Sequence, residues 1–215
     1  MTLARAALLL MLLACGRSEA GDVPLPPRRP PVLPPIQAPV ADAACGRLLA
    51  GGQVEAAPAA LVAGAGGCGI AAPVRLAAIV LGDGARVALE PPATMRCELA
   101  AALALWVRED VAPAAPGGGL AKILSADAYA CRPRNGVAGA KLSEHGKGNA
   151  LDIRGVVLRD GTRLLVSDKG EFTAALGAGA CARFPTMLGP GSDGLHEDHI
   201  HVDLEARRGG YRICR

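Results

Sequence analysis

Alternating and continuous runs of hydrophobic residues predict several β-strands in this chain. These runs cover residues 74–79, 87–89, 122–129, 149–159, 163–166 and 199–204. The first two flank the turn sequence Leu-Gly-Asp-Gly at 81–84, which indicates a β-hairpin. Asp160-Gly161 joins two later runs, and this dipeptide accepts the positive φ of a tight turn.

Other segments carry apolar residues at helical spacing. Residues 93–111 form the longest of them, and Pro113 is expected to end that helix. Its apolar face consists of Leu99, Leu103, Trp106 and Val107. A short helix is expected at 169–176, and the Ala/Gly-rich residues 45–73 are expected to form a short helix plus loops. The sum is an α+β domain, with helices on one face of an antiparallel sheet.

The first fourteen residues have the pattern of a lipoprotein signal peptide. Arg5 supplies a positive start, Ala6–Leu13 is apolar, and the sequence Leu-Leu-Ala-Cys-Gly at 12–16 resembles a lipobox. The segment is too short to span a bilayer as a stable helix. We expect cleavage before Cys15 and lipidation of that residue, since two or three acyl chains anchor a protein stably in a membrane. In the alternative interpretation, the signal peptide is an ordinary one and Cys15 is incidental.

Residues 15–40 are predicted to be a tether. Eight of the seventeen prolines lie between Asp22 and Val40. Proline fixes φ and lacks an N–H, so this stretch favours polyproline II and a semi-rigid spacer. A ligand for a proline-recognition domain is the alternative.

Residues 41–215 are long enough for one compact domain. Aromatic residues make up 2% of the chain, so the core must rest on aliphatic side chains that each bury less area. Disulfides would offset this weaker hydrophobic stabilisation. Six cysteines remain besides Cys15: Cys45, Cys68, Cys97, Cys131, Cys181 and Cys214. An even number in an exported chain implies three disulfides, and pairing in chain order would give 45–68, 97–131 and 181–214.

One motif carries candidate metal chemistry. The sequence Ser-Glu-His-Gly-Lys-Gly-Asn-Ala-Leu-Asp at 143–152 is followed 47 residues later by His-Ile-His at 199–201. His145, Asp152 and a remote histidine supply three nitrogen and oxygen ligands, a set that suits a catalytic zinc with water in the fourth position. Residues two apart in a strand face the same side, so His199 and His201 are expected to lie together.

The pattern S-x-H-x-x-G-x-A-x-D followed by H-x-H resembles the active-site signature of zinc murein peptidases and D-alanyl-D-alanine carboxypeptidases, which share their fold with the hedgehog signalling domain. More closely, the stretch from about Cys45 to Arg215 resembles the bacterial extensin-like C-terminal domain. The resemblance implies that His145, Asp152 and His201 bind Zn²⁺. The metal would then lie on the sheet face opposite the helices.

The resemblance also implies residues that use the metal. The base for a zinc-bound water is His199 or Asp198, and we favour His199 because strict alternation turns Asp198 away from His201. Arg132, beside Cys131, is expected to bind a substrate carboxylate or the developing oxyanion, because a guanidinium keeps its charge and offers a fixed fork of donors.

Three neighbouring polar residues are expected in supporting positions. Asp203 could orient a ligand histidine from behind, as metal-bound imidazoles usually require. His196 is expected on the surface or at the rim of the substrate groove, and Ser143 either lines that groove or stabilises a turn.

We therefore expect a monomeric periplasmic protein, lipid-anchored to the inner or the outer membrane, that acts as a zinc-dependent peptidase on peptidoglycan stem peptides or crosslinks. The alternative is a non-catalytic lipoprotein, either a zinc-stabilised cell-wall binding module or a structural protein with an empty site. The net charge of +3 has no clustered basic stripe, which argues against nucleic acid as a partner.

Overall fold

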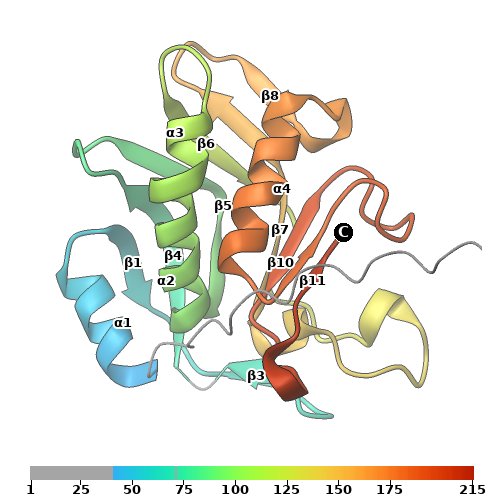
Figure 1. Ribbon diagram of the computed structural model, residues 1–215. Coiled ribbons are helices and arrows are strands. Elements are labelled where there is room, and N and C mark those ends of the chain that lie inside the picture. Colours follow the sequence, from blue (N-terminus) through green and yellow to red (C-terminus); the bar gives the residue numbers. More distant parts are fainter. Residues whose placement is uncertain (1–40, 71) are drawn as a thin grey trace, which may run out of the picture. The chain divides into compact units, whose positions relative to one another are not determined.

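A computed structural model of the protein describes residues 41–70 and 72–215, which form a nine-stranded mixed sheet with helices on one face (Figure 1). The strands of this sheet are β1 (Val54–Pro58), β4 (Pro73–Val80), β5 (Arg86–Arg96), β6 (Leu120–Ser125), β7 (Ala150–Leu158), β8 (Arg163–Leu165), β9 (Thr186–Leu188), β10 (Ile200–Asp203) and β11 (Ile213–Cys214). Their order is β1-β4-β5-β6-β7-β10-β9-β11, and β8 pairs with β7. Two short strands, β2 (Val62–Ala63) and β3 (Gly69–Ile70), form a separate sheet. The signal peptide, the lipobox and the tether predicted above lie outside the described residues.

The predicted hairpins are confirmed. β4 and β5 pair antiparallel around residues 81–85, and β7 and β8 pair antiparallel around Asp160-Gly161. An antiparallel sheet was predicted, and most strand pairs are antiparallel. Two pairs are parallel instead: β5 with β6, and β9 with β11. The first exception has a direct cause, because a helical crossover between β5 and β6 returns the chain in the same direction.

That crossover is α2 (Cys97–Trp106), which continues through a π-helical turn (Val107–Val111) into α3 (Ala112–Ala114). The predicted start at residue 93 is wrong because β5 extends to Arg96, and the helix ends one residue after Pro113. The other helices are α1 (Ala41–Ala50) and α4 (Glu171–Arg183). Single 3₁₀ turns occur at Arg134–Gly136, Glu144–Lys147, Val166–Asp168 and Arg208–Gly210. None of the described helices is long and apolar enough to cross a membrane.

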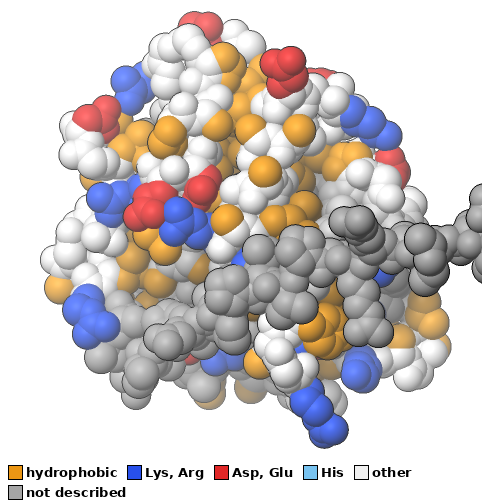
Figure 2. All heavy atoms as spheres, in the orientation of Figure 1, with side chains coloured by type: hydrophobic (Ala, Val, Ile, Leu, Met, Phe, Trp, Pro, Cys, Tyr) orange, Lys and Arg blue, Asp and Glu red, His pale blue; other side chains and the backbone are white. Residues whose placement is uncertain are grey.

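The core lies between the sheet and α2 and α4, which cover one face of it (Figure 1). Trp106 and Phe184 pack edge to face in this layer, with ring centroids 5.9 Å apart, and the other large buried side chains are mainly aliphatic. On the outer surface around α2 and α4, apolar side chains are interspersed with charged ones (Figure 2). The sheet strands β7 and β10 contribute Leu151, Ile153 and Ile200 to this core. Alternation along those strands turns the intervening residues to the opposite face.

The six cysteines form three disulfides, as expected, but two of the expected pairings are wrong. The bonds are Cys45–Cys97, Cys68–Cys131 and Cys181–Cys214. α1 packs beside α2, which brings Cys45 to the first residue of α2 instead of to Cys68. Chain order failed for these pairs because partners are chosen by packing between elements.

The Cys68–Cys131 disulfide should stabilise the domain most directly around residues 129–146, because the Cys68 sulfur lies 3.3 Å from where a Cβ on Gly146 would be. Replacing both cysteines by alanine should lower the free energy of unfolding by about 2–4 kcal/mol, measured in guanidinium chloride. Non-reducing peptide mapping of the unaltered protein should recover this pair, and a peptide linked through Cys45 and Cys68 would contradict the arrangement.

Candidate metal centre

Three buried side chains converge on the sheet face opposite the helices. Asp152 of β7 lies directly across from His201 of β10 in the antiparallel register, and His145 belongs to the 3₁₀ turn that precedes β7. Asp152 Oδ1 lies 2.8 Å from His201 Nδ1 and 3.2 Å from His145 Nε2, and the two imidazole nitrogens are 3.1 Å apart. These atoms form a group that could hold a metal ion.

The turn that carries His145 is fixed by local geometry. The Ser143 hydroxyl accepts a long hydrogen bond of 3.4 Å from the His145 N–H, which supports its predicted turn-stabilising role. Gly148 ends the turn at φ +62°, a conformation that favours glycine, and a Cβ there would lie 2.2 Å from Ile70 Cδ1, so a larger residue would also have to displace the Ile70 side chain. The buried Glu144 side chain accepts hydrogen bonds from Lys147 and Asn149, and these bonds stabilise the turn.

The outer nitrogen of each imidazole has an acceptor. His145 Nδ1 donates to the carbonyl oxygen of Ala128 at 2.9 Å, and His201 Nε2 donates to Asp203 Oδ2 at 3.1 Å. Asp203 is itself held by the Thr186 hydroxyl at 2.5 Å. In a neutral imidazole only one nitrogen carries hydrogen, so the inner nitrogens present lone pairs to each other and to Asp152. Asp203 thus has the position expected for a residue that orients a ligand.

Two lone pairs and a carboxylate this close together require a positive charge between them. In the metal-free protein a proton meets part of this need: burial lowers the pKa of His201, but hydrogen bonds to Asp152 and Asp203 outweigh it and raise this pKa to about 9. Burial raises the pKa of Asp152, yet the neighbouring histidines lower it overall. Ligands about 2.0–2.2 Å from a tetrahedral zinc would lie about 3.3–3.6 Å apart, which is wider than the 2.8, 3.1 and 3.2 Å found here, so a bound zinc ion would move these atoms slightly apart. The imidazole and carboxylate donors are of the kinds that bind zinc, and the group could hold a metal ion.

His199 and Asp198 form one pair beside these ligands. His199 Nε2 lies 3.7 Å from Asp152 Oδ2, while His199 Nδ1 donates to Asp198 Oδ1 at 2.8 Å. The Asp198 side chain is 61% exposed, on the far side of the imidazole. The hydrogen bond to His199 lowers the pKa of Asp198. The His199 imidazole therefore lies next to the candidate metal ligands, and the Asp198 carboxylate lies on the side of the ring that is turned away from them.

An open cleft of about 480 Å³ gives access to this pair and to Asp152. It is lined by Ser125, Ala126, Asp127, Arg132, Asp152, Arg154, Asp198 and His199. Arg132 donates to Asp127 Oδ2 at 2.8 Å, and the neighbouring Cys131 is tied down by its disulfide. Arg134, the next arginine, is paired with Glu205 instead. Arg132 is thus the member of the two that borders the cleft.

His196 is more central than its sequence position indicated. We expected it on the surface or at a rim, but it is 8% exposed, and its ring centroid lies 5.0 Å from that of His199 and 5.7 Å from that of His201. Its Nδ1 donates to Asp193 Oδ1 at 2.6 Å. His196 borders a smaller cavity of about 120 Å³, which His145 and His201 also line. The sequence offered one signal for this position: His196 and His199 lie three residues apart in the same loop, so their side chains could be expected close together.

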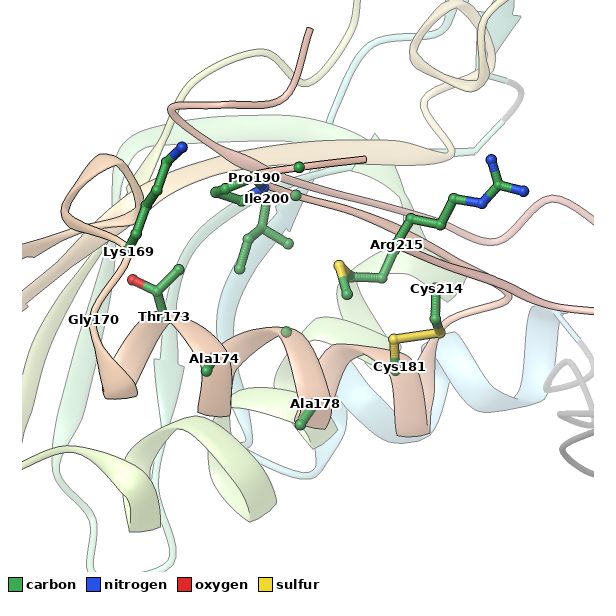
Figure 3. A pocket seen from close by; sticks show the side chains of 14 residues that line it. Lys169, Gly170, Thr173, Ala174, Ala178, Cys181, Pro190, Ile200, Cys214 and Arg215 are labelled. Atoms are coloured by element: carbon green, nitrogen blue, oxygen red, sulfur yellow. A yellow bond between two sulfur atoms is a disulfide. The ribbon is translucent and has the colours of Figure 1, made fainter. Parts of the chain in front are cut away.

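A separate hollow of about 520 Å³ lies on the helix side of the sheet, between α4 and the strands β9 and β11 (Figure 3). Ile200 points into it, whereas the next residue, His201, faces the ligands. Lys169 stands at one end, where its ammonium is paired with Glu197 at 2.7 Å, and the Cys181–Cys214 disulfide closes the other (Figure 3). Its lining is mostly small and apolar, so this hollow lacks the chemistry of the candidate metal centre despite its size.

Comparison with known proteins points to one family. The model of the family described as "Extensin-like protein C-terminus" matches residues 43–215, which include all the residues of the candidate metal centre. No curated protein and no solved structure matches the chain.

Zinc binding should release protons in a pH-dependent way. Because the raised pKa of His201 keeps this ring protonated at pH 7 in the metal-free protein, a zinc ion must displace about one proton there, and the number of protons that come from His201 should fall towards zero above pH 9. Calorimetric titration of the metal-free protein with zinc, in buffers of different ionisation enthalpy, measures this number. Equal heats in all buffers at pH 7 would contradict the assigned site.

Substitution of Asp203, which accepts a hydrogen bond from His201, should lower the affinity of the site for zinc without removing a ligand. Asp203→Asn is expected to lower zinc affinity by about 10- to 100-fold, because the His201 ring loses its charged acceptor. Asp193→Asn is the matched control, since Asp193 holds His196 and no member of the ligand set. Competition with a chromogenic chelator would compare the variants, and equal affinities would rule out this role for Asp203.

Proposed function

The chain belongs to the family of extensin-like protein C-terminal domains, and from its site we propose that it is a zinc-dependent peptidase of the cell envelope, acting on peptidoglycan stem peptides or crosslinks. The observation that carries this proposal is the convergence of His145 Nε2, Asp152 Oδ1 and His201 Nδ1 beside an open cleft. A purely structural ion would need no accessible histidine next to its ligands, yet His199 stands there.

A zinc ion held by these three residues would polarise the scissile carbonyl and bring the pKa of a bound water to about 7. His199 is the proposed base, because its Nε2 faces the ligand group and an imidazole nitrogen can accept a proton and pass it on. Asp198 fixes the tautomer that leaves this nitrogen free to accept a proton. The two residues that the sequence offered as rival bases thus act together, with His199 transferring the proton and Asp198 positioning it.

Arg132 is the proposed group that steadies developing negative charge. Its guanidinium is held by Asp127 at the edge of the cleft, so the donors are already oriented when a peptide binds. The disulfide at Cys131 restrains the backbone next to it. A fixed, permanently charged donor is what oxyanion stabilisation requires.

The proposal extends to the cell-envelope context. The resemblance to zinc murein peptidases supports the substrate class, because the same ligand pattern serves peptide hydrolysis there. Lipidation at Cys15, the proline-rich tether and a periplasmic location rest on the sequence pattern of residues 1–40. A tethered monomer would reach a polymer held away from the membrane, which suits peptidoglycan as the partner.

A non-catalytic, zinc-stabilised binding module is the second candidate. The ligands come from the 3₁₀ turn, β7 and β10, so a metal would stabilise the domain by joining separate segments even without catalysis. In that case a chelator would lower the melting temperature, and the zinc-loaded protein would bind peptidoglycan without cutting it.

Digestion of purified muropeptides by the zinc-loaded protein, analysed by mass spectrometry, tests the proposal. Products should appear with zinc and disappear with chelator. His199→Ala should lower kcat by about 10²- to 10⁴-fold, the contribution usual for proton transfer by a side chain, while its zinc content stays at one ion per chain. Undiminished turnover in this variant would remove His199 from the mechanism. Absence of any product from the unaltered, zinc-loaded protein would favour the binding module.

A further inference from the structure

Arg154 occupies an unusual position in the strand that carries Asp152. On one side, β7 pairs with β10 through Ile153 and with β8 from Gly155 onward. On the other side, the register with β6 passes from Gly155 opposite Leu124 straight to Ile153 opposite Ser125. Arg154 is therefore the extra residue of a β-bulge, without a partner residue in any neighbouring strand of the described sheet.

Such bulges re-aim a side chain and are frequent beside active sites. Here the bulge is held in place by Gly155, whose φ is +154° and where a Cβ would lie 2.3 Å from the Leu164 carbonyl oxygen. A larger residue at 155 would clash with the backbone of the β7–β8 hairpin. The sequence thus builds a local break in the ladder, two residues after a proposed metal ligand.

The Arg154 side chain is exposed and borders the same cleft as Asp152 and His199. Among the described residues it forms no ion pair and no side-chain hydrogen bond, whereas Arg132 is engaged by Asp127. The cleft therefore contains two guanidinium groups in different states. One is fixed by a carboxylate of the protein, and the donors of the other are available to a ligand.

We propose that Arg154 is a specificity-determining residue that binds a free carboxylate of the peptide substrate next to the scissile bond. The inference rests on the proposed peptidase function and deepens it, because it specifies peptides with a carboxylate near the cleaved bond. A planar guanidinium binds a carboxylate through two parallel hydrogen bonds, which provides orientation as well as affinity. Arg154 holds that carboxylate, and Arg132 remains the donor for the oxyanion.

Two synthetic stem peptides test this assignment, identical except that one carries a carboxylate and the other a carboxamide beside the scissile bond. The zinc-loaded protein should prefer the carboxylate peptide by about 10- to 100-fold in kcat/KM, the range expected for a hydrogen bond to a charged group. Arg154→Gln should abolish this preference by slowing only the carboxylate peptide, and Arg154→Lys should restore part of it.

Arg75→Gln is the matched control, because Arg75 is also an exposed arginine of the sheet, lies outside the cleft and has no ion-pair partner among the described residues. It should leave the preference unchanged, although it alters the net charge equally. The inference is overturned if Arg154→Gln slows both peptides to the same extent, or if the preference survives in that variant.

Binding of the same peptides to the metal-free protein, measured by calorimetry, separates this inference from the proposed function. Tighter binding of the carboxylate peptide, lost in Arg154→Gln, supports the role of Arg154 even if the zinc-loaded protein cuts neither peptide, in which case the peptidase proposal fails alone. Equal binding of both peptides by the unaltered protein, together with equal cleavage rates, overturns the role of Arg154 and leaves the peptidase proposal standing.

Discussion

The pairing of β7 with β10 is the constraint on which the rest of the site depends. This register sets Asp152 opposite His201, and it simultaneously directs Leu151, Ile153 and Ile200 into the core between sheet and helices. A slip by one residue would exchange the two faces, burying the polar side chains in the core and exposing the apolar ones. Hydrophobic burial on one side of the sheet therefore holds the candidate metal ligands in place on the other.

On the face of the sheet opposite the helices, this fixed register holds the Asp152 carboxylate close to the inner nitrogens of His145 and His201. Ala128 and Asp203 take the outer hydrogens of the two imidazoles, so the inner nitrogens meet Asp152 without a donor of their own. Such a cluster is stable only with a cation, whether a proton or a metal ion. The same arrangement explains why His201 holds a proton so firmly in the metal-free protein and why metal binding must compete with that proton.

The disulfides link the stability of this small aliphatic core to the geometry of the cleft. Trp106 and Phe184 are the two large aromatic side chains of the core, and the remaining packing is mostly Leu, Ile, Val and Ala. Cys68–Cys131 lies against the turn of His145 and restrains the backbone beside Arg132. A cross-link that limits the unfolded chain thus also limits movement of groups around the site.

Local sequence patterns determined the features that depend on near neighbours, namely the two hairpins and the strands with alternating faces. The cysteine count indicated three disulfides, and the resemblance to zinc peptidases marked His145, Asp152 and His201. The tertiary structure alone decided the disulfide partners, the parallel pairs, the burial of His196, the joining of Asp198 to His199 and the bulge at Arg154. Alternation and turn propensity act over a few residues and can be read directly. Disulfide partners, strand order and bulges depend on which distant segments pack together. That packing depends on contacts throughout the core and cannot be derived from any one segment.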